Sequence, residues 1–264
     1  MYKCVSRKGN FMAISYYNSP SGTKLAYVHT LPLKEGERLP AVVFLGGFKS
    51  DMAGTKAIYL EEHCKGRGQE FLRFDYSGHG KSSGDFSKGT IGSWKQDAMD
   101  IISHVLKDRD IILVGSSMGG WIALRLLIEN PSHICAVVGI AAAPDFTKDI
   151  ENMMSKEDHE MMERLGRLEI PNDYSDEPYI FTRKLLEDGR EQSLLDERHN
   201  IGAPLVLIQG KLDRDVPWKK AIIIKEYFIG SDTEIIFIED GDHRLSREED
   251  LKVIDAQVRK LSGL

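Results

Sequence analysis

Short apolar runs alternate with amphipathic stretches along most of the chain. Val42–Leu45 and Ile111–Val114 are apolar at every position. Runs of this kind, without polar residues at alternate positions, are typical of parallel strands that are buried on both faces. On this basis we predict strands at Lys24–Thr30, Ala41–Leu45, Glu70–Asp75, Ile111–Gly115, Ile134–Ala141, Leu205–Gln209 and Glu234–Glu239.

The amphipathic stretches between these strands have the spacing of helices. In Ile91–Leu106 the apolar positions recur about every 3.6 residues, as in an α-helix; they are Trp94, Ala98, Ile101, Ile102 and Val105. Further helices are predicted at Thr55–Lys65, Trp121–Glu129 and Arg247–Leu261. Alternating strands and helices predict an α/β fold, in which a mostly parallel central sheet is covered by helices on both faces.

Residues 145–203 interrupt this alternation. They carry many charges and no strong strand pattern, so we predict two or three helices inserted between core elements. Because predicted core elements lie on both sides of the insertion, we expect residues 1–264 to form a single domain. Residues 145–203 would then be a helical lid on that domain.

Composition narrows the classes of function. The chain has 264 residues, of which 41% are hydrophobic and 29% charged, and its formal net charge is −6. This balance is that of a globular protein and lacks the basic footprint of a nucleic-acid-binding domain. The longest strongly apolar run, Ile134–Ala143, is too short to span a bilayer. We therefore expect no nucleic-acid partner and no transmembrane segment.

The cysteines and the N-terminus bear on the compartment. Cys4, Cys64 and Cys135 are widely spaced and form no C-x-x-C pair, so neither a zinc site nor a disulfide framework is predicted. Residues Met1–Lys8 are not followed by the apolar core of a secretory signal. We expect a reduced, cytoplasmic protein that needs no metal or other cofactor.

The strongest chemical signal is the sequence GSSMG at residues 115–119, which fits G-x-S-x-G with Ser117 at its centre. It follows an apolar run and opens a predicted helix, the context in which this pattern places a serine hydroxyl on a sharp turn above the sheet. Ser117 is therefore the candidate nucleophile. The N–H of Met118, at the start of the helix, is a candidate oxyanion donor.

A serine hydroxyl needs a base, and the base needs an orienting acid. Of the histidines after Ser117, only His243 directly follows a predicted strand, where the catalytic groups of parallel sheets gather. Asp213 is the first candidate for the acid and Asp215 the second, since both follow the strand that ends near Gln209. The second oxyanion donor is expected in the Gly-Gly loop after an earlier strand, at the N–H of Phe48.

These residues together resemble the α/β-hydrolase family. Residues Asp75–Gly84 resemble that family's turn D-x-x-G-x-G-x-S-x-G, which makes His79 a turn residue and not the base. The segment Gly210–Pro217 resembles the family's acid loop and favours Asp213 over Asp215. The resemblance implies a catalytic set of Ser117, Asp213 and His243, no metal, and the hydrolysis of esters or thioesters.

One branch of the family is especially similar. The segments that carry the likeness are Phe44–Ala57, Arg73–Gly78, Gly115–Trp121 and, in the insertion, Tyr179–Arg190. That branch contains a mitochondrial palmitoyl-protein thioesterase, also known as an acyl-glucuronide esterase, and its bacterial relatives. The chain departs from the usual pattern in having Gly46-Gly47 where Pro-Gly is more common. We also expect no mitochondrial presequence before the domain.

The insertion carries the predictions about the substrate. Met153 and Met162 lie in its predicted helices, where they either pack a lid against the core or line an apolar acyl pocket. The expected substrate is a small-molecule ester or an acylated protein. Two alternatives stay open: a serine peptidase or amidase that acts on small substrates, and a hydrolase-fold protein that binds a ligand without turnover.

Overall fold

A central eight-stranded sheet organises the chain. The computed structural model describes residues 13–32, 39–129, 131–172 and 177–264. The sheet order is β1-β2-β4-β3-β5-β6-β10-β12, and only the pairs β1–β2 and β2–β4 are antiparallel. The strands are β1 (Ser15–Asn18), β2 (Lys24–Thr30), β3 (Ala41–Leu45), β4 (Phe71–Phe74), β5 (Ile111–Ser116), β6 (Ile134–Ile140), β10 (Leu205–Gly210) and β12 (Thr233–Ile238). The predicted mostly parallel sheet is confirmed.

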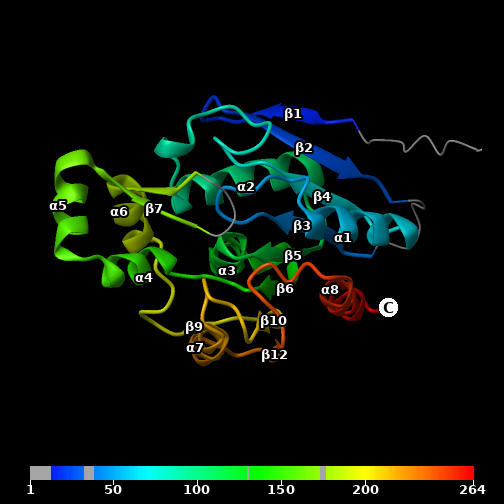
Figure 1. Cartoon of the computed structure of the whole chain (residues 1–264). Helices are drawn as coiled ribbons and strands as arrows, with labels where there is room; N and C mark the ends of the chain where they lie inside the picture. The colour runs from blue at the N-terminus through cyan, green and yellow to red at the C-terminus, as the bar shows by residue number, and fades with distance from the viewer. Residues whose placement is uncertain (1–12, 33–38, 130, 173–176) are drawn as a thin grey trace, which may run out of the picture.

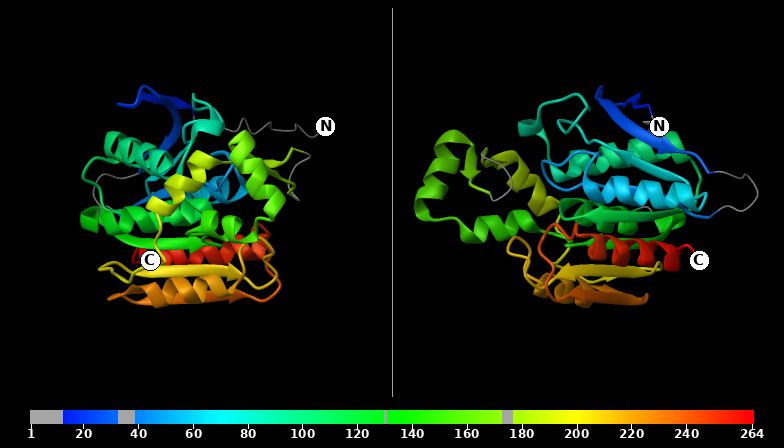
Figure 2. Two further views of the ribbon diagram at one scale, coloured as in Figure 1. Left: turned by 90° about the vertical axis from the view of Figure 1, so that its left-hand side faces the viewer. Right: turned by 45° about the vertical axis from the view of Figure 1, so that its right-hand side comes forward.

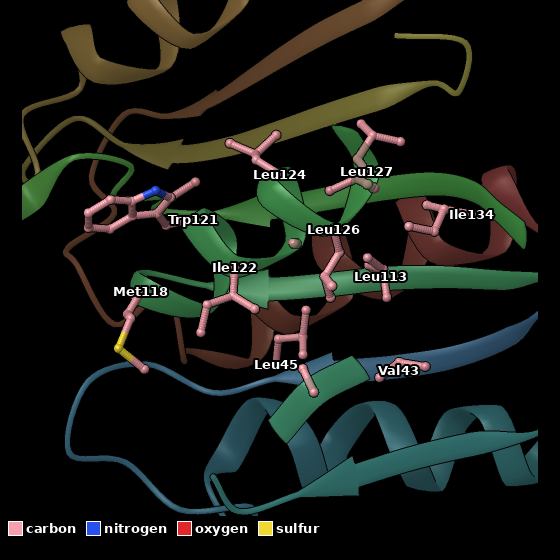
Figure 3. Packing of buried hydrophobic residues seen from close by; sticks show 14 of the residues in the cluster. Val43, Leu45, Leu113, Met118, Trp121, Ile122, Leu124, Leu126, Leu127 and Ile134 are labelled. Carbon is pink, nitrogen blue, oxygen red and sulfur yellow. The ribbon is translucent and has the colours of Figure 1, made fainter. Parts of the chain in front are cut away.

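Helices cover both faces of the sheet, as the alternation predicts (Figure 1). One face carries α2 (Ile91–Leu106), α3 (Met118–Glu129) and α7 (Lys219–Tyr227), and the other carries α1 (Thr55–Gly66) and α8 (Glu248–Leu261). Figure 3 shows side chains of α3, among them Ile122 and Leu126, packed with Leu45 and Leu113 of the sheet. None of the described helices combines the length and the apolar character that a bilayer crossing requires.

Local chemistry explains where several elements begin. The hydroxyl of Thr90 accepts from the N–H of Ser93 at the start of α2, and the Ser93 hydroxyl accepts from the N–H of Thr90, which satisfies two otherwise unpaired donors. The sequence did not predict α7, because its run of isoleucines resembles a strand. It also did not predict β1, a four-residue edge strand. Short 3-10 turns lie at Phe86–Lys88 and Pro131–His133.

The insertion between β6 and β10 contains the predicted helices and a short hairpin. It contains α4 (Phe146–Met153), α5 (Lys156–Leu165) and α6 (Arg183–Glu191), and also a two-stranded antiparallel sheet of β7 (Arg167–Ile170) and β8 (Tyr179–Thr182). The two or three predicted helices are therefore present as three, and the hairpin is an addition that the sequence did not predict. The run Arg167–Ile170 alternates polar and apolar residues, but four residues are the shortest run in which alternation indicates a strand. A further pair joins β9 (His199–Asn200) to β11 (Phe228–Ile229). Figure 2 shows that α4, α5 and α6 project beyond one end of the central sheet.

Candidate active site

Ser117 occupies a sharp turn between β5 and α3. Its φ of 55° lies in the left-handed region, which costs a non-glycine residue free energy and persists only where the surroundings hold it. The Ser117 N–H donates to the carbonyl of Ile140 over 2.9 Å, and its carbonyl accepts from the N–H of Ala143 over 3.1 Å. The end of β6 therefore supports the turn from one side.

Two glycines make this turn possible. A Cβ added to Gly115 would lie 2.3 Å from the carbonyl oxygen of Gly119, and one added to Gly119 would lie 2.1 Å from the carbonyl oxygen of Leu45. Neither position has room for a side chain. The geometry is that of a nucleophile elbow, which presents the serine at the carboxyl edge of the sheet.

The loop after β3 lies directly against the elbow. A Cβ built on Gly47 would be 3.5 Å from the Cβ of Ser117. Among the residues that the structure describes, the N–H groups of Phe48 and Met118 have no hydrogen-bond acceptor. Both are therefore available to a substrate oxygen beside Ser117, although their role as oxyanion donors stays a prediction.

The structure brings His243 and Asp213 together. Nδ1 of His243 lies 2.9 Å from Oδ2 of Asp213, whose side chain is fully buried. His243 follows β12 and Asp213 follows β10, while Ser117 follows β5. Because β5, β6, β10 and β12 are neighbours and parallel, all three residues lie at the same edge of the sheet.

Asp213 is a hydrogen-bond partner of the imidazole, and the backbone of Asp215 supports its carboxylate. Oδ1 of Asp213 accepts from the N–H groups of Asp215 and Val216, over 2.9 and 2.8 Å. The backbone of Asp215 therefore helps to hold the Asp213 carboxylate, and the Asp215 side chain is exposed. This separation of roles supports the order of preference that the sequence indicated.

Sequence reasoning did not single out Gln209. Its side chain is 1% exposed, and Nε2 donates to Oδ2 of Asp213 over 2.9 Å and to the carbonyl of Val216 over 3.1 Å. The amide thus ties the carboxylate to the loop after β10. A polar residue inside an otherwise apolar strand was the available signal, since a buried amide requires partners.

Asp213, Asp215 and His243 are also the only group among the described residues whose side chains could converge on a metal ion. Their candidate ligand atoms lie within 4.8 Å of one another. However, the Asp213 oxygens already accept four hydrogen bonds, and Nδ1 of His243 is one of the donors. This hydrogen bonding suits an acid that orients a base better than a set of metal ligands.

Aromatic side chains connect the Phe48 loop to the insertion. The ring of Phe48 stacks on Phe181 of β8 with centroids 5.2 Å apart, and it meets Tyr179 edge to face at 5.6 Å. Phe146 at the start of α4 lies 5.9 Å away. Nζ of Lys49 approaches Oε2 of Glu177 at 3.4 Å. The insertion is therefore packed against the candidate oxyanion loop.

The two methionines of the insertion lie elsewhere. The side chain of Met153 is 75% exposed, whereas Met162 is buried and packs with Leu168 and Leu186. Met162 also lines a cavity of about 290 Å³ within the insertion, along with Arg183 and other residues of α5 and α6. The role of Met153 and Met162 in an acyl pocket stays a prediction.

The fold and this arrangement of residues define an α/β-hydrolase. The chain belongs to the family described as serine aminopeptidase, S33, whose model matches residues 37–179. It is 33% identical over 257 residues to the human protein "Palmitoyl-protein thioesterase ABHD10, mitochondrial", and the match covers 96% of this chain and 82% of that protein. The resemblance to this branch is confirmed, and the chain is a hydrolase.

Solved structures agree with this assignment. A putative hydrolase from Agrobacterium vitis S4 superimposes with a TM-score of 0.90 at 36% identity, over 95% of this chain and 98% of that one. The α/β hydrolase domain-containing protein 10 from mouse gives a TM-score of 0.86 at 30% identity, over 94% of this chain and 98% of that one. Both likenesses extend through the insertion as well as the core.

The comparisons contradict the expected cytoplasmic location. The mouse and human relatives, at 32% and 33% identity, are both named as mitochondrial proteins. The expectation rested on cysteine spacing and on the absence of a leader pattern. Neither observation reports on the compartment directly, because reduced cysteines are also compatible with other compartments.

Proposed function

We propose that this protein is a serine hydrolase that cleaves carboxylic ester or acyl-thioester bonds through an acyl-enzyme on Ser117. The observation that carries the proposal is the hydrogen bond of 2.9 Å between His243 and the buried Asp213, on the sheet edge where Ser117 takes a left-handed turn. Relatives named as palmitoyl-protein thioesterases, at 33% identity, support an acyl substrate. The substrate class is then a small-molecule ester or an acylated protein.

In the proposed reaction, Oγ of Ser117 attacks the acyl carbonyl and its proton passes to Nε2 of His243. The Asp213 carboxylate holds Nδ1–H and stabilises the imidazolium. The negative oxygen that forms accepts hydrogen bonds from the N–H groups of Met118 and Phe48. The bond to the alcohol or thiol breaks, and His243 gives its proton to that leaving group.

The second half of the reaction repeats these roles with water. His243 takes a proton from water as the water attacks the acyl-enzyme, and it returns that proton to Oγ of Ser117 as the acid leaves. No step needs a metal or an organic cofactor, because the imidazole moves every proton and the two N–H groups stabilise the charge.

We further propose that residues 145–203 form a lid on a single domain of residues 1–264, and that β8 forms a wall of the acyl site. Tyr179 and Phe181 contact Phe48, whose N–H is the proposed oxyanion donor. A substrate whose carbonyl oxygen reaches that N–H brings its acyl chain near these rings. Aromatic side chains bury much area at little entropic cost, which suits an apolar acyl group.

The test is an activity screen with p-nitrophenyl esters, acyl thioesters and anilides of increasing chain length, together with a fluorophosphonate probe. We expect turnover of esters or thioesters, labelling at Ser117, and no labelling of Ser117→Ala. Tyr179→Ala should change the preferred acyl length. Ser116→Ala, which removes the hydroxyl one position before the nucleophile, serves as the matched control and should still be labelled.

Three results would contradict the proposal. Labelling that persists in Ser117→Ala would move the nucleophile elsewhere. Faster cleavage of anilides than of esters would favour a peptidase or amidase, in line with the description of the family. Binding of acyl compounds without turnover or labelling would make the protein a ligand binder.

A further inference from the structure

Lys56 occupies an unfavourable position in the segment Gly54–Ala57, which carried part of the resemblance but has no role in the proposed reaction. It is the second residue of α1, whose first turn contains no acidic residue. The positive end of the helix dipole disfavours a cation at this point. Burial also lowers the pKa of the Lys56 ammonium to about 8. The helix dipole and the burial both disfavour the charged ammonium at this residue. A lysine in such a position indicates another contact that stabilises it.

That contact is with the loop that carries His243. Nζ of Lys56 donates a hydrogen bond to the carbonyl oxygen of Arg244, the residue after His243. The carboxylates of Asp242 and Asp250 are the charges that favour the ammonium at this place, while Arg244 opposes it. Lys56 therefore binds a backbone carbonyl that is 188 positions away in sequence and lies beside the proposed base.

The loop needs such support because its backbone is strained. Leu245 has a φ of 44° and a fully buried side chain, and a left-handed residue with a branched side chain costs free energy. The N–H of Leu245 donates to Oδ1 of Asp242 over 3.0 Å. From the neighbouring loop, the N–H of Leu212 donates to the carbonyl of Gly241 over 2.9 Å. Contacts on both sides thus define the path of the chain through His243.

We propose that Lys56 is a positioning residue for the proposed base. It fixes the Arg244 carbonyl from the side of α1, so that the imidazole of His243 meets Asp213 on one side and Ser117 on the other. This inference rests on the proposed function, because it assigns the lysine a role only through His243.

The experiment compares Lys56→Met with Lys65→Met, an exposed lysine on the same helix. The readouts are kcat and KM on a p-nitrophenyl ester and the rate of inactivation by a fluorophosphonate. A misplaced catalytic group costs about ten- to a hundred-fold in rate, so Lys56→Met should lower kcat and the inactivation rate by at least about tenfold. KM should change little, and Lys65→Met should behave as wild type.

The decisive comparison is made in a His243→Ala background. If Lys56 acts through His243, adding Lys56→Met to His243→Ala should not lower the inactivation rate further. General damage to the fold would lower it in both backgrounds. Lys56→Gln, which removes the charge and shortens the reach, carries the same prediction and replaces Lys56→Met if that variant does not fold.

The outcomes separate the two proposals. A wild-type protein that neither turns over esters nor is labelled at Ser117 would overturn the proposed function and this inference with it. A labelled wild type whose rates are unchanged by Lys56→Met would overturn the inference alone. Equal losses in the two backgrounds would also overturn it.

Discussion

The buried imidazole of His79 makes the stability of this protein depend on pH. The side chain is 3% exposed and is surrounded by the rings of Phe86, Trp94 and Tyr76, with centroids 5.0, 5.1 and 5.5 Å away. Nδ1 lies 3.2 Å from the carbonyl oxygen of Ser77, to which it donates, and Nε2 has no partner among the described residues. A proton on Nε2 would therefore be buried without an acceptor.

Burial lowers the pKa of His79 from 6.5 to about 4. The folded state thus resists protonation, and the unfolded state binds the proton more readily. The stability that the neutral imidazole contributes is complete above pH 6.5 and is lost as the pH falls toward 4. Since one pKa unit corresponds to about 1.4 kcal/mol, the full shift is worth about 3 kcal/mol, of which about 2 kcal/mol is lost between pH 7.5 and pH 5.

The assay is urea unfolding at pH 7.5 and pH 5 for wild type and for His79→Phe, which keeps an aromatic ring among its neighbours. Burial raises the pKa of Asp75 and of Asp97, so both proteins contain other titrating groups and only their difference is informative. The free energy of unfolding should fall by about 2 kcal/mol more in wild type than in the variant. Equal losses in the two proteins would refute the reasoning.

Two further variants test the framework of the site. Gly119→Ala would place a methyl group 2.1 Å from the Leu45 carbonyl oxygen, so we expect its free energy of unfolding to fall by about 3 kcal/mol or more in thermal or urea unfolding. The control is Gly202→Ala, where a Cβ meets nothing within 4 Å and which should be close to neutral. Comparable stability of the two variants would contradict the packing argument. Gln209→Met removes the amide that donates to Oδ2 of Asp213. We expect kcat for ester hydrolysis to fall about tenfold with little change in KM. An unchanged kcat would show that the other hydrogen-bond donors are sufficient to hold the Asp213 carboxylate.

Much of the fold follows from local sequence pattern. The predicted strands around Val42 and Ile112 were confirmed. An unbroken apolar run of this length buries all its side chains when it forms a strand that is covered on both faces. The elbow at Ser117 was also predictable. Its geometry is set by a strand, two glycines and the start of a helix that follow one another in the sequence. The steric contacts involved are therefore largely local.

Other features depend on contacts between segments that are distant in sequence. The hairpin of β7 and β8 has strands of only four residues, the minimum for a recognisable period, and β8 packs against Phe48 from the core. The choice of Asp213 over Asp215 was indicated by resemblance, but the hydrogen bonds from His243, Gln209 and the loop backbone provide its physical basis.

Local patterns in the chain were thus sufficient to define the α/β class, the turn that presents Ser117 and the residues that could accompany it. How those residues meet became visible only in three dimensions. His243 and Asp213 are 30 positions apart, and Lys56 and Arg244 are 188 apart, yet each pair shares a hydrogen bond. Such a bond depends on how all the surrounding elements pack. Periodicity in the sequence reports only which face of one element is buried, so it does not predict a hydrogen bond between distant segments.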